Sequence, residues 1–158
     1  MKKFLVCRSN PKHFIEKSNK SDKHLIIYCK DLKTVFEAWH DHVDCTVKKI
    51  TINNFTDDPK LSINPYALMP ELTVSTSVKE LNFNCYTHDY WMTLVLSLCP
   101  NVQELHFHKL TKEKLKHIAE NLEFVTHIKC YYIENDIIDF YNDLISHRND
   151  INSEIKIN

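Results

Sequence analysis

The sequence predicts an α/β fold in which short strands and helices alternate and stack as a right-handed solenoid with a parallel sheet. One observation is a six-residue template, apolar-x-x-apolar-x-apolar. It begins at Val47, Val78, Val102 and Val125, so successive copies start 31, 24 and 23 residues apart. Another is that the apolar period changes from two within each template to three or four between templates. Self-similarity at such spacings is typical of repeat architectures, whose units bury their cores only against their neighbours.

Each template predicts a strand, because its apolar residues alternate with polar ones and successive side chains of a strand point to opposite faces. The four strands expected on this basis cover residues 47–52, 78–83, 102–107 and 125–130. Three weaker strands are expected at 24–29, 155–157 and 3–7. Because helices separate the strands, neighbouring strands are expected to run parallel.

Helices are expected where the apolar period matches a helix face. After the N-cap residue Thr111, apolar residues follow at Leu115, Ile118, Ala119 and Leu122. Other helices are expected over 87–98, from Asn135 onwards and from Asp31 onwards. The segment 56–77 contains three prolines, so we expect an irregular crossover there, with one short turn near 66–68.

Composition narrows the functional classes. The 158 residues predict a single domain, 1–158, with its clearest repeats over 47–158. A net charge of −1 gives no basic surface for nucleic acid. The sequence has no 18-residue apolar run, which predicts no membrane span. The apolar start is interrupted at Arg8, too early for a signal peptide, so a cytoplasmic or nuclear location is expected. Glycine is absent, which excludes the glycine-dependent nucleotide loops and nucleophile elbows.

The six cysteines show no C-x-x-C pair and are widely spaced, which favours reduced, buried thiols over a zinc or redox motif. A nucleophilic Cys–His site is the enzymatic alternative, but Cys29, Cys99 and Cys130 lie where core packing is expected. The large aromatic residues at helical spacing are predicted to be packing residues rather than a ligand box; they are Phe36, Trp39, Trp91 and Phe140.

One stretch resembles a known family. Cys99-Pro100-Asn101-Val102-Gln103-Glu104-Leu105-His106-Phe107, followed by Leu110-Thr111, Leu115 and Ile118-Ala119, is similar to the cysteine-containing leucine-rich repeat. This repeat belongs to ribonuclease-inhibitor-like proteins and to F-box leucine-rich-repeat proteins. The similarity is best over 78–133 and looser over 24–55 and 134–158. It implies one leucine-rich-repeat-like domain, with strands lining a concave face and helices on the convex face.

The resemblance also implies a function. Such a domain is a non-catalytic protein-binding module, here the substrate-recognition part of an F-box-type ubiquitin-ligase receptor. Its partners would be a substrate protein and, within a longer chain, ubiquitin-ligase components. No segment resembling an F-box is found, and the sequence begins and ends in repeat-like material. We therefore expect a longer polypeptide, atypical end caps, or stacking with a second copy.

The predicted binding site is the set of template side chains that point away from the core. Because strands lie ~4.8 Å apart, four of them present a surface about 15 Å across. Tyr131 is its expected anchor. The grid comprises Lys49, Thr51, Asn53, Glu80, Asn82, Asn84, Glu104, His106, His108, His127, Lys129 and Tyr131. The plainer alternative is a solvated sheet face without a partner.

Two further functions stay open. One is a stand-alone leucine-rich-repeat scaffold or inhibitor with no link to a ligase. The more distant one is a metal-dependent enzyme using His106, His108 and His127, with Glu80 nearby, because zinc accepts imidazole and carboxylate ligands. A flat parallel sheet presents side chains in rows and rarely converges four of them. The sequence therefore predicts no enzyme, no resident metal and no cofactor.

Overall fold

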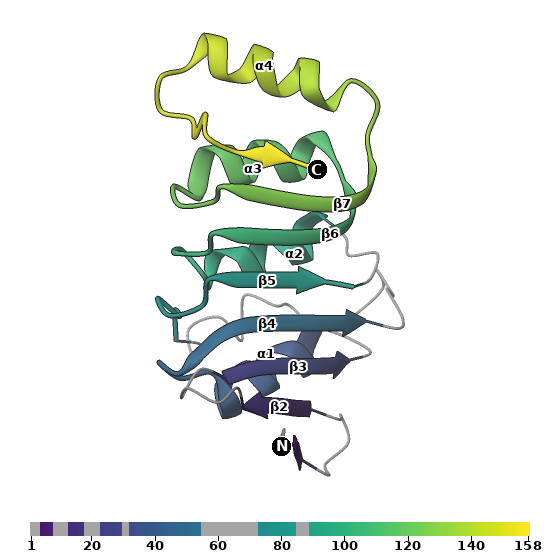
Figure 1. Cartoon of the computed structure of the whole chain (residues 1–158), viewed down its shortest axis with the longest axis vertical. Coiled ribbons are helices and arrows are strands. Elements are labelled where there is room, and N and C mark those ends of the chain that lie inside the picture. Colours follow the sequence, from purple (N-terminus) through teal and green to yellow (C-terminus); the bar gives the residue numbers. More distant parts are fainter. Residues whose placement is uncertain (1–3, 8–12, 18–22, 30–31, 55–72, 85–88) are drawn as a thin grey trace.

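The computed structural model describes residues 4–7, 13–17, 23–29, 32–54, 73–84 and 89–158 (Figure 1). Eight strands form one sheet in the order of the sequence. The strands are β1 (Phe4–Cys7), β2 (His13–Lys17), β3 (Lys23–Cys29), β4 (Val47–Asn54), β5 (Glu80–Phe83), β6 (Glu104–Leu110), β7 (His127–Ile133) and β8 (Lys156–Ile157). The helices are α1 (Leu32–His42), α2 (Asp89–Ser97), α3 (Lys112–Asn121) and α4 (Ile137–His147).

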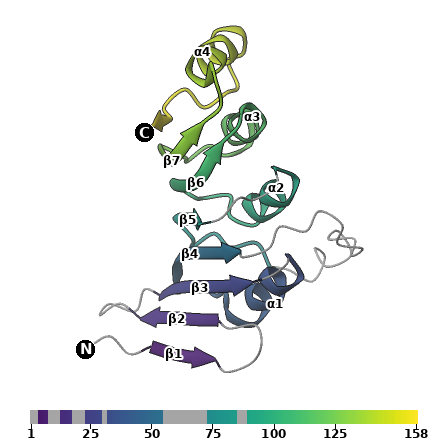
Figure 2. The ribbon, with the colours of Figure 1, turned by 90° about the vertical axis from the view of Figure 1, so that its right-hand side faces the viewer.

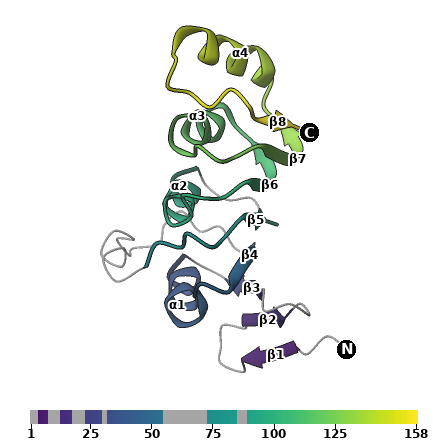
Figure 3. The ribbon, with the colours of Figure 1, turned by 60° about the vertical axis from the view of Figure 1, so that its left-hand side comes forward.

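Strands β3 to β8 form a six-stranded parallel sheet, and the four helices cover one of its faces (Figures 2 and 3). The predicted α/β class with a parallel sheet is therefore confirmed. The predicted number of about six strand–helix units compares with six parallel strands and four helices in the residues described. Most of the connection between β4 and β5 lies outside those residues.

The N-terminal strands differ from the prediction. A strand at 3–7 was expected, and β1 lies there, but β2 was not foreseen. Both of these strands pair antiparallel, β1 with β2 and β2 with β3. The two strands of each pair are connected by only five residues, 8–12 between β1 and β2 and 18–22 between β2 and β3. Because a parallel crossover needs about a dozen residues or more, such short connections permit only antiparallel neighbours.

The template positions coincide with the register of the sheet. Lys49 pairs with Glu80, Glu80 with Glu104, and Glu104 with His127. The next template position, an apolar one, is paired in the same way along β4 to β7. Since a slip of one residue would turn every buried side chain to the other face, the apolar pattern specifies this register.

The core lies between the sheet and the helices. The apolar template residues are all buried except Cys130, which is partly exposed; the buried set is Val47, Ile50, Ile52, Val78, Leu81, Phe83, Val102, Leu105, Phe107, Val125 and Ile128. Each such side chain stabilises the fold by about 1.5–3 kcal/mol. Phe36 and Trp39 are buried as predicted, and Phe140 packs against the same core. The side chain of Trp91 lies outside those described.

The predicted helix starts are confirmed to within two residues. Thr111 has an extended backbone, and its hydroxyl accepts a hydrogen bond from the Lys114 amide at 3.2 Å. The carboxylate of Glu134, beyond β7, accepts from the Lys112 amide at 2.6 Å. Helix α3 is therefore capped both by its own sequence and by the next unit. The N-cap of α4 is Asp136, one residue after the expected Asn135.

The thiols are less uniformly buried than expected. Cys99 is buried, and burial raises the pKa of its thiol far above its usual value. Cys130 is partly exposed, and burial again raises its pKa. Cys45 is exposed, which contradicts the expectation of burial, because it lies in the turn between α1 and β4. The side chain of Cys29 lies outside those described.

The predicted crossover over 56–77 is described only from residue 73 onwards. Residues 73–77 contain neither helix nor strand, as expected. The indole nitrogen of Trp39 donates to the Thr73 carbonyl at 3.0 Å and so ties this segment to α1. The short turn predicted near 66–68 lies outside the described residues. Within the described residues, no helix combines the length and the apolar character needed to span a bilayer.

Candidate functional site: the outer face of the sheet

The candidate site is the outer face, by which we mean the face of β3 to β7 turned away from the four helices. The core residues of β4 to β7 alternate with the predicted site residues of these strands, as expected for opposite faces of a strand. Of the twelve, Asn84 lies just beyond β5 and Thr51 is itself buried. Lys49, Glu80, Glu104 and His127 form a first row of register partners. Thr51, Asn82, His106 and Lys129 form the second row.

The third predicted row is less regular. Asn53 lies on β4, and Asn84 follows the last residue of β5. The pairing between β5 and β6 ends at Asn82 and His106. Asn84 therefore lies beyond that ladder, whereas His108 and Tyr131 lie next to each other on β6 and β7.

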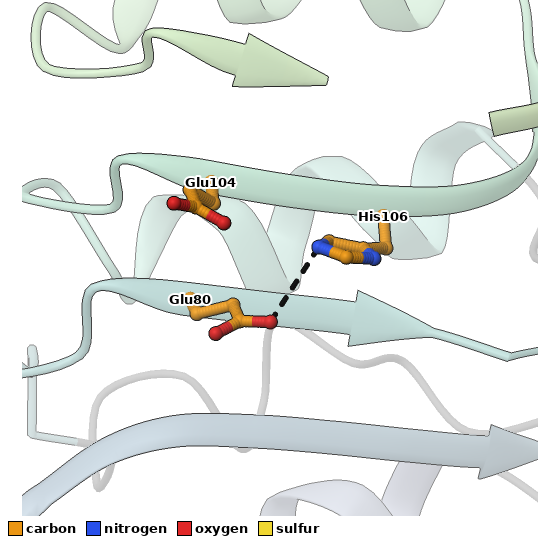
Figure 4. Close-up of side chains that lie close together, drawn as sticks. All are labelled: Glu80, Glu104 and His106. Carbon is orange, nitrogen blue, oxygen red and sulfur yellow. Dashed lines mark ion pairs between the residues drawn. The ribbon is translucent and has the colours of Figure 1, made fainter. Parts of the chain in front are cut away.

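A charged cluster occupies the middle of the outer face. The ammonium of Lys49 lies 2.9 Å from Oε1 of Glu80, and Nε2 of His106 lies 3.5 Å from the same oxygen (Figure 4). Glu104 carries a second carboxylate beside them (Figure 4). The side chains of Glu80 and His106 are 26% and 29% exposed, so this cluster is partly shielded from water.

The environment of His106 favours its neutral form. Desolvation lowers the pKa of the imidazole, and the positive charges of Lys129 and Lys49 lower it further, against the opposing effects of Glu80 and Glu104. Because the ordinary value is already near 6.5, the neutral form of the ring predominates at pH 7. A neutral imidazole has one nitrogen lone pair available as an acceptor or metal ligand.

A chain of hydrogen bonds runs from His24 on β3, the register partner of Lys49, to Thr51 and Asn82 of the second row. Nε2 of His24 lies 2.7 Å from the hydroxyl of Thr51, and the amide nitrogen of Asn82 donates to that hydroxyl at 3.4 Å. Thr51 is consequently buried although it lies on the outer face. His24 was not among the predicted site residues. The signal was available, because Leu25 and Ile27 point to the core and alternation places His24 opposite.

Two neighbouring polar atoms in this row have no hydrogen-bond partner. They are Oδ1 of Asn82 and Nε2 of His106, and both are buried at the level of the atom. The 3.5 Å contact of His106 with Glu80 is too long for a good hydrogen bond. An unsatisfied buried polar atom costs about 1–3 kcal/mol. A ligand that reached these atoms would therefore recover free energy.

An aromatic group marks the end of the face at β7. Tyr131 is 83% exposed and Tyr132 is 62% exposed. The His108 ring lies 6.0 Å from the Tyr131 ring and 5.3 Å from the Tyr132 ring. Tyr132 was not predicted, because alternation assigns it to the core side. Ile133 beside it is also exposed, so the strand extends beyond the closely packed core here.

Among the described residues, one set of three His, Cys, Asp or Glu side chains lies close enough together to hold a metal ion. One ligand atom each from Glu80, Glu104 and His106 lie within 4.8 Å of one another. The alternative set of His106, His108 and His127 does not converge in this way. Nδ1 of His127 instead lies 2.9 Å from the Thr126 hydroxyl. Sequence reasoning placed these three residues in one patch together with His108 and His127, but it did not single them out as the convergent set.

A hollow of about 720 Å³ lies elsewhere, between the end of α3 and the loop after α4. Its polar groups are largely used in holding that loop. Arg148 pairs with Glu120 and Asp150. The side-chain amide of Asn152 donates to the carbonyls of Leu122, Glu123 and Val125. Because these polar groups hold the loop in place, we interpret the hollow as structural rather than as a binding site.

Comparisons of the chain with protein-family models, curated proteins and solved structures gave no match. The resemblance to leucine-rich-repeat proteins therefore rests on the sequence pattern and stays a prediction.

Proposed function

We propose that this chain is a leucine-rich-repeat-like solenoid whose outer face is concave and binds a protein segment without catalysing a reaction. The observation that carries the proposal is the composition of the outer face. Four adjacent strands present donors, acceptors and both charges in register, and the exposed pair Tyr131 and Tyr132 lies at one end.

The physical chemistry of interfaces supports this choice. Tyrosine is enriched among residues that contribute most to binding, because it combines a large apolar ring with a polar tip. The unpartnered polar atoms of Asn82 and His106 are buried, so a bound chain reaches them only when the side chains above them move. The opposite face of the sheet does not bind the partner in this proposal, because it is packed against the helices.

The dimensions of the face indicate the kind of partner. Four strands span about 15 Å, and three rows two residues apart span about 13 Å. The area enclosed by these two lengths is far below the roughly 800 Å² that each partner contributes to a standard protein–protein interface. We therefore infer an extended peptide segment as the partner. A larger partner would also have to contact residues outside the grid.

The finer proposal is that the chain is the substrate-recognition part of an F-box-type ubiquitin-ligase receptor. It is supported only by the repeat resemblance, and the ligase components would contact other segments of a longer polypeptide. The second candidate is a stand-alone scaffold or inhibitor. It uses the same outer face, so the presence or absence of co-purifying ligase subunits distinguishes the two.

The test is affinity capture of binding proteins from the native cell type, followed by quantitative mass spectrometry. The binding-face variant is Tyr131→Ala combined with Lys129→Glu. The matched control is Lys116→Glu, which changes the charge of an exposed residue on α3. We expect the captured amount of at least one partner to fall about tenfold in the binding-face variant and to stay unchanged in the control.

The opposite pattern would refute the proposal. Partners that survive in the Tyr131 and Lys129 variant but are lost with Lys116→Glu would assign binding to the helices. Ligase subunits among the retained proteins would support the receptor function, and a substrate without them would support the stand-alone scaffold.

A further inference from the structure

The group formed by Glu80, Glu104 and His106 has features that ion pairing does not explain. All three residues project from the neighbouring strands β5 and β6 into one region of the outer face (Figure 4). Their ligand atoms lie within 4.8 Å of one another. Nε2 of His106 is buried and lacks a hydrogen-bond partner.

The separation of one pair of these atoms, on His106 and Glu80, corresponds to metal ligation better than to hydrogen bonding. Zinc binds imidazole nitrogen and carboxylate oxygen at about 2.0–2.2 Å, which in a tetrahedron places two ligand atoms about 3.4 Å apart. Nε2 of His106 and Oε1 of Glu80 are 3.5 Å apart. These two atoms are therefore already separated as two ligands of one ion would be.

We propose that Glu80, Glu104 and His106 form a binding site for a divalent transition-metal ion, with Zn²⁺ as the ion that best fits this donor set. Two carboxylates and one imidazole satisfy the ligand preferences of zinc. Three protein ligands leave a fourth position facing away from the sheet. The site shares its three residues with the proposed peptide-binding face, so an ion and a peptide group compete for Nε2 of His106. Titration of the chain with Zn²⁺ alone tests the metal site without the peptide.

Lys49 competes with the ion. Its ammonium lies 2.9 Å from Oε1 of Glu80, and Lys129 is the register partner of His106. These two cations offset the charge of the two carboxylates, so binding requires Lys49 to move away from Glu80. Its side chain is 34% exposed, which leaves room for that movement. Removal of the Lys49 charge should therefore strengthen metal binding.

The test is isothermal titration of the purified full chain with Zn²⁺, using an ion-free preparation. We expect one ion per chain. His106→Ala and the nearly isosteric Glu104→Gln should each weaken binding about tenfold or more. Lys49→Met should strengthen it severalfold. The matched control is His108→Ala, which removes an imidazole two residues along the same strand and should leave the affinity unchanged. Circular dichroism verifies that each variant is folded.

Substitution with Co²⁺ gives an independent reading of the ligands. The expected spectrum is that of a low-coordinate ion with nitrogen and oxygen donors. Absorption from thiolate-to-metal charge transfer would assign binding to a cysteine and overturn the proposal. So would a lack of stoichiometric Zn²⁺ binding, an affinity unchanged by both His106→Ala and Glu104→Gln, or a loss with His108→Ala as large as with His106→Ala.

Discussion

Asp136 shows at the scale of one residue how a chain without glycine makes a tight connection. It precedes α4 and has φ of 61°, in the left-handed region. Aspartate tolerates this region better than most residues but still at a cost, because its Cβ approaches backbone atoms. Its side chain makes no hydrogen bond to cap the helix. The main requirement at this position is therefore that the residue adopts a positive φ, and not that it carries a carboxylate.

This argument predicts the order of two variants. Asp136→Gly should be more stable than Asp136→Ala by about 0.5–1 kcal/mol, because glycine adopts positive φ without a steric penalty. Both changes remove the carboxylate, so its electrostatic effect on the helix N-terminus cancels in the comparison. Equilibrium denaturation with urea measures the difference. An alanine variant as stable as the glycine variant would show that the left-handed conformation is not demanding.

The residue scale also shows why the candidate site was only partly predictable. The template identified Glu80, Glu104 and His106 as outward-facing, because alternation determines which face a strand residue occupies. It could not identify the convergence of their ligand atoms, which depends on side-chain rotamers. The same reasoning could have identified His24 as outward-facing. Tyr132 was not, because its exposure reflects where the packed core ends.

At the scale of elements, Lys114 connects α2, α3 and β6. Its side chain is 3% exposed, and its ammonium donates to the Lys109 carbonyl at 3.0 Å and lies 3.4 Å from Asp89. The ammonium also lies 5.9 Å from the centre of the Phe107 ring. Asp89 accepts a further hydrogen bond from the Thr111 hydroxyl at 3.1 Å. The first turn of α3 is therefore held to the start of α2 by a buried charge pair.

Loss of one partner should be worse than loss of both. Asp89→Asn removes the negative charge that lies 3.4 Å from the buried ammonium and should cost about 2 kcal/mol, less than the 3–5 kcal/mol of fully buried pairs because Asp89 is partly exposed. Adding Lys114→Met to that variant should restore part of the stability. A double-mutant cycle by chemical denaturation measures the coupling. Additive losses would indicate that the two side chains do not interact.

The elements differ in how well the sequence predicted them. The helices and the strands β4 to β7 follow from strong apolar periodicity, and Thr111 is the predicted cap. β2 was missed because His13 to Lys17 shows weak alternation. Once β2 is located, the five-residue connections on either side of it account for its antiparallel pairing.

At the scale of the whole molecule, the order of the strands in the sheet equals their order in the sequence. In this arrangement the contacts between elements are mainly those of successive units, and equivalent template positions lie side by side. A single outer face therefore accumulates one row of side chains for each template position. The repeated pattern predicted that face.

The most direct test of the proposed function is to map the contact surface by NMR while titrating the captured partner segment. We expect the largest chemical-shift changes on the outer face of β4 to β7, including Tyr131, His108 and Asn82, and small changes in the exposed residues of α1, α3 and α4. Changes concentrated on those helices, with the outer face unaffected, would contradict the account.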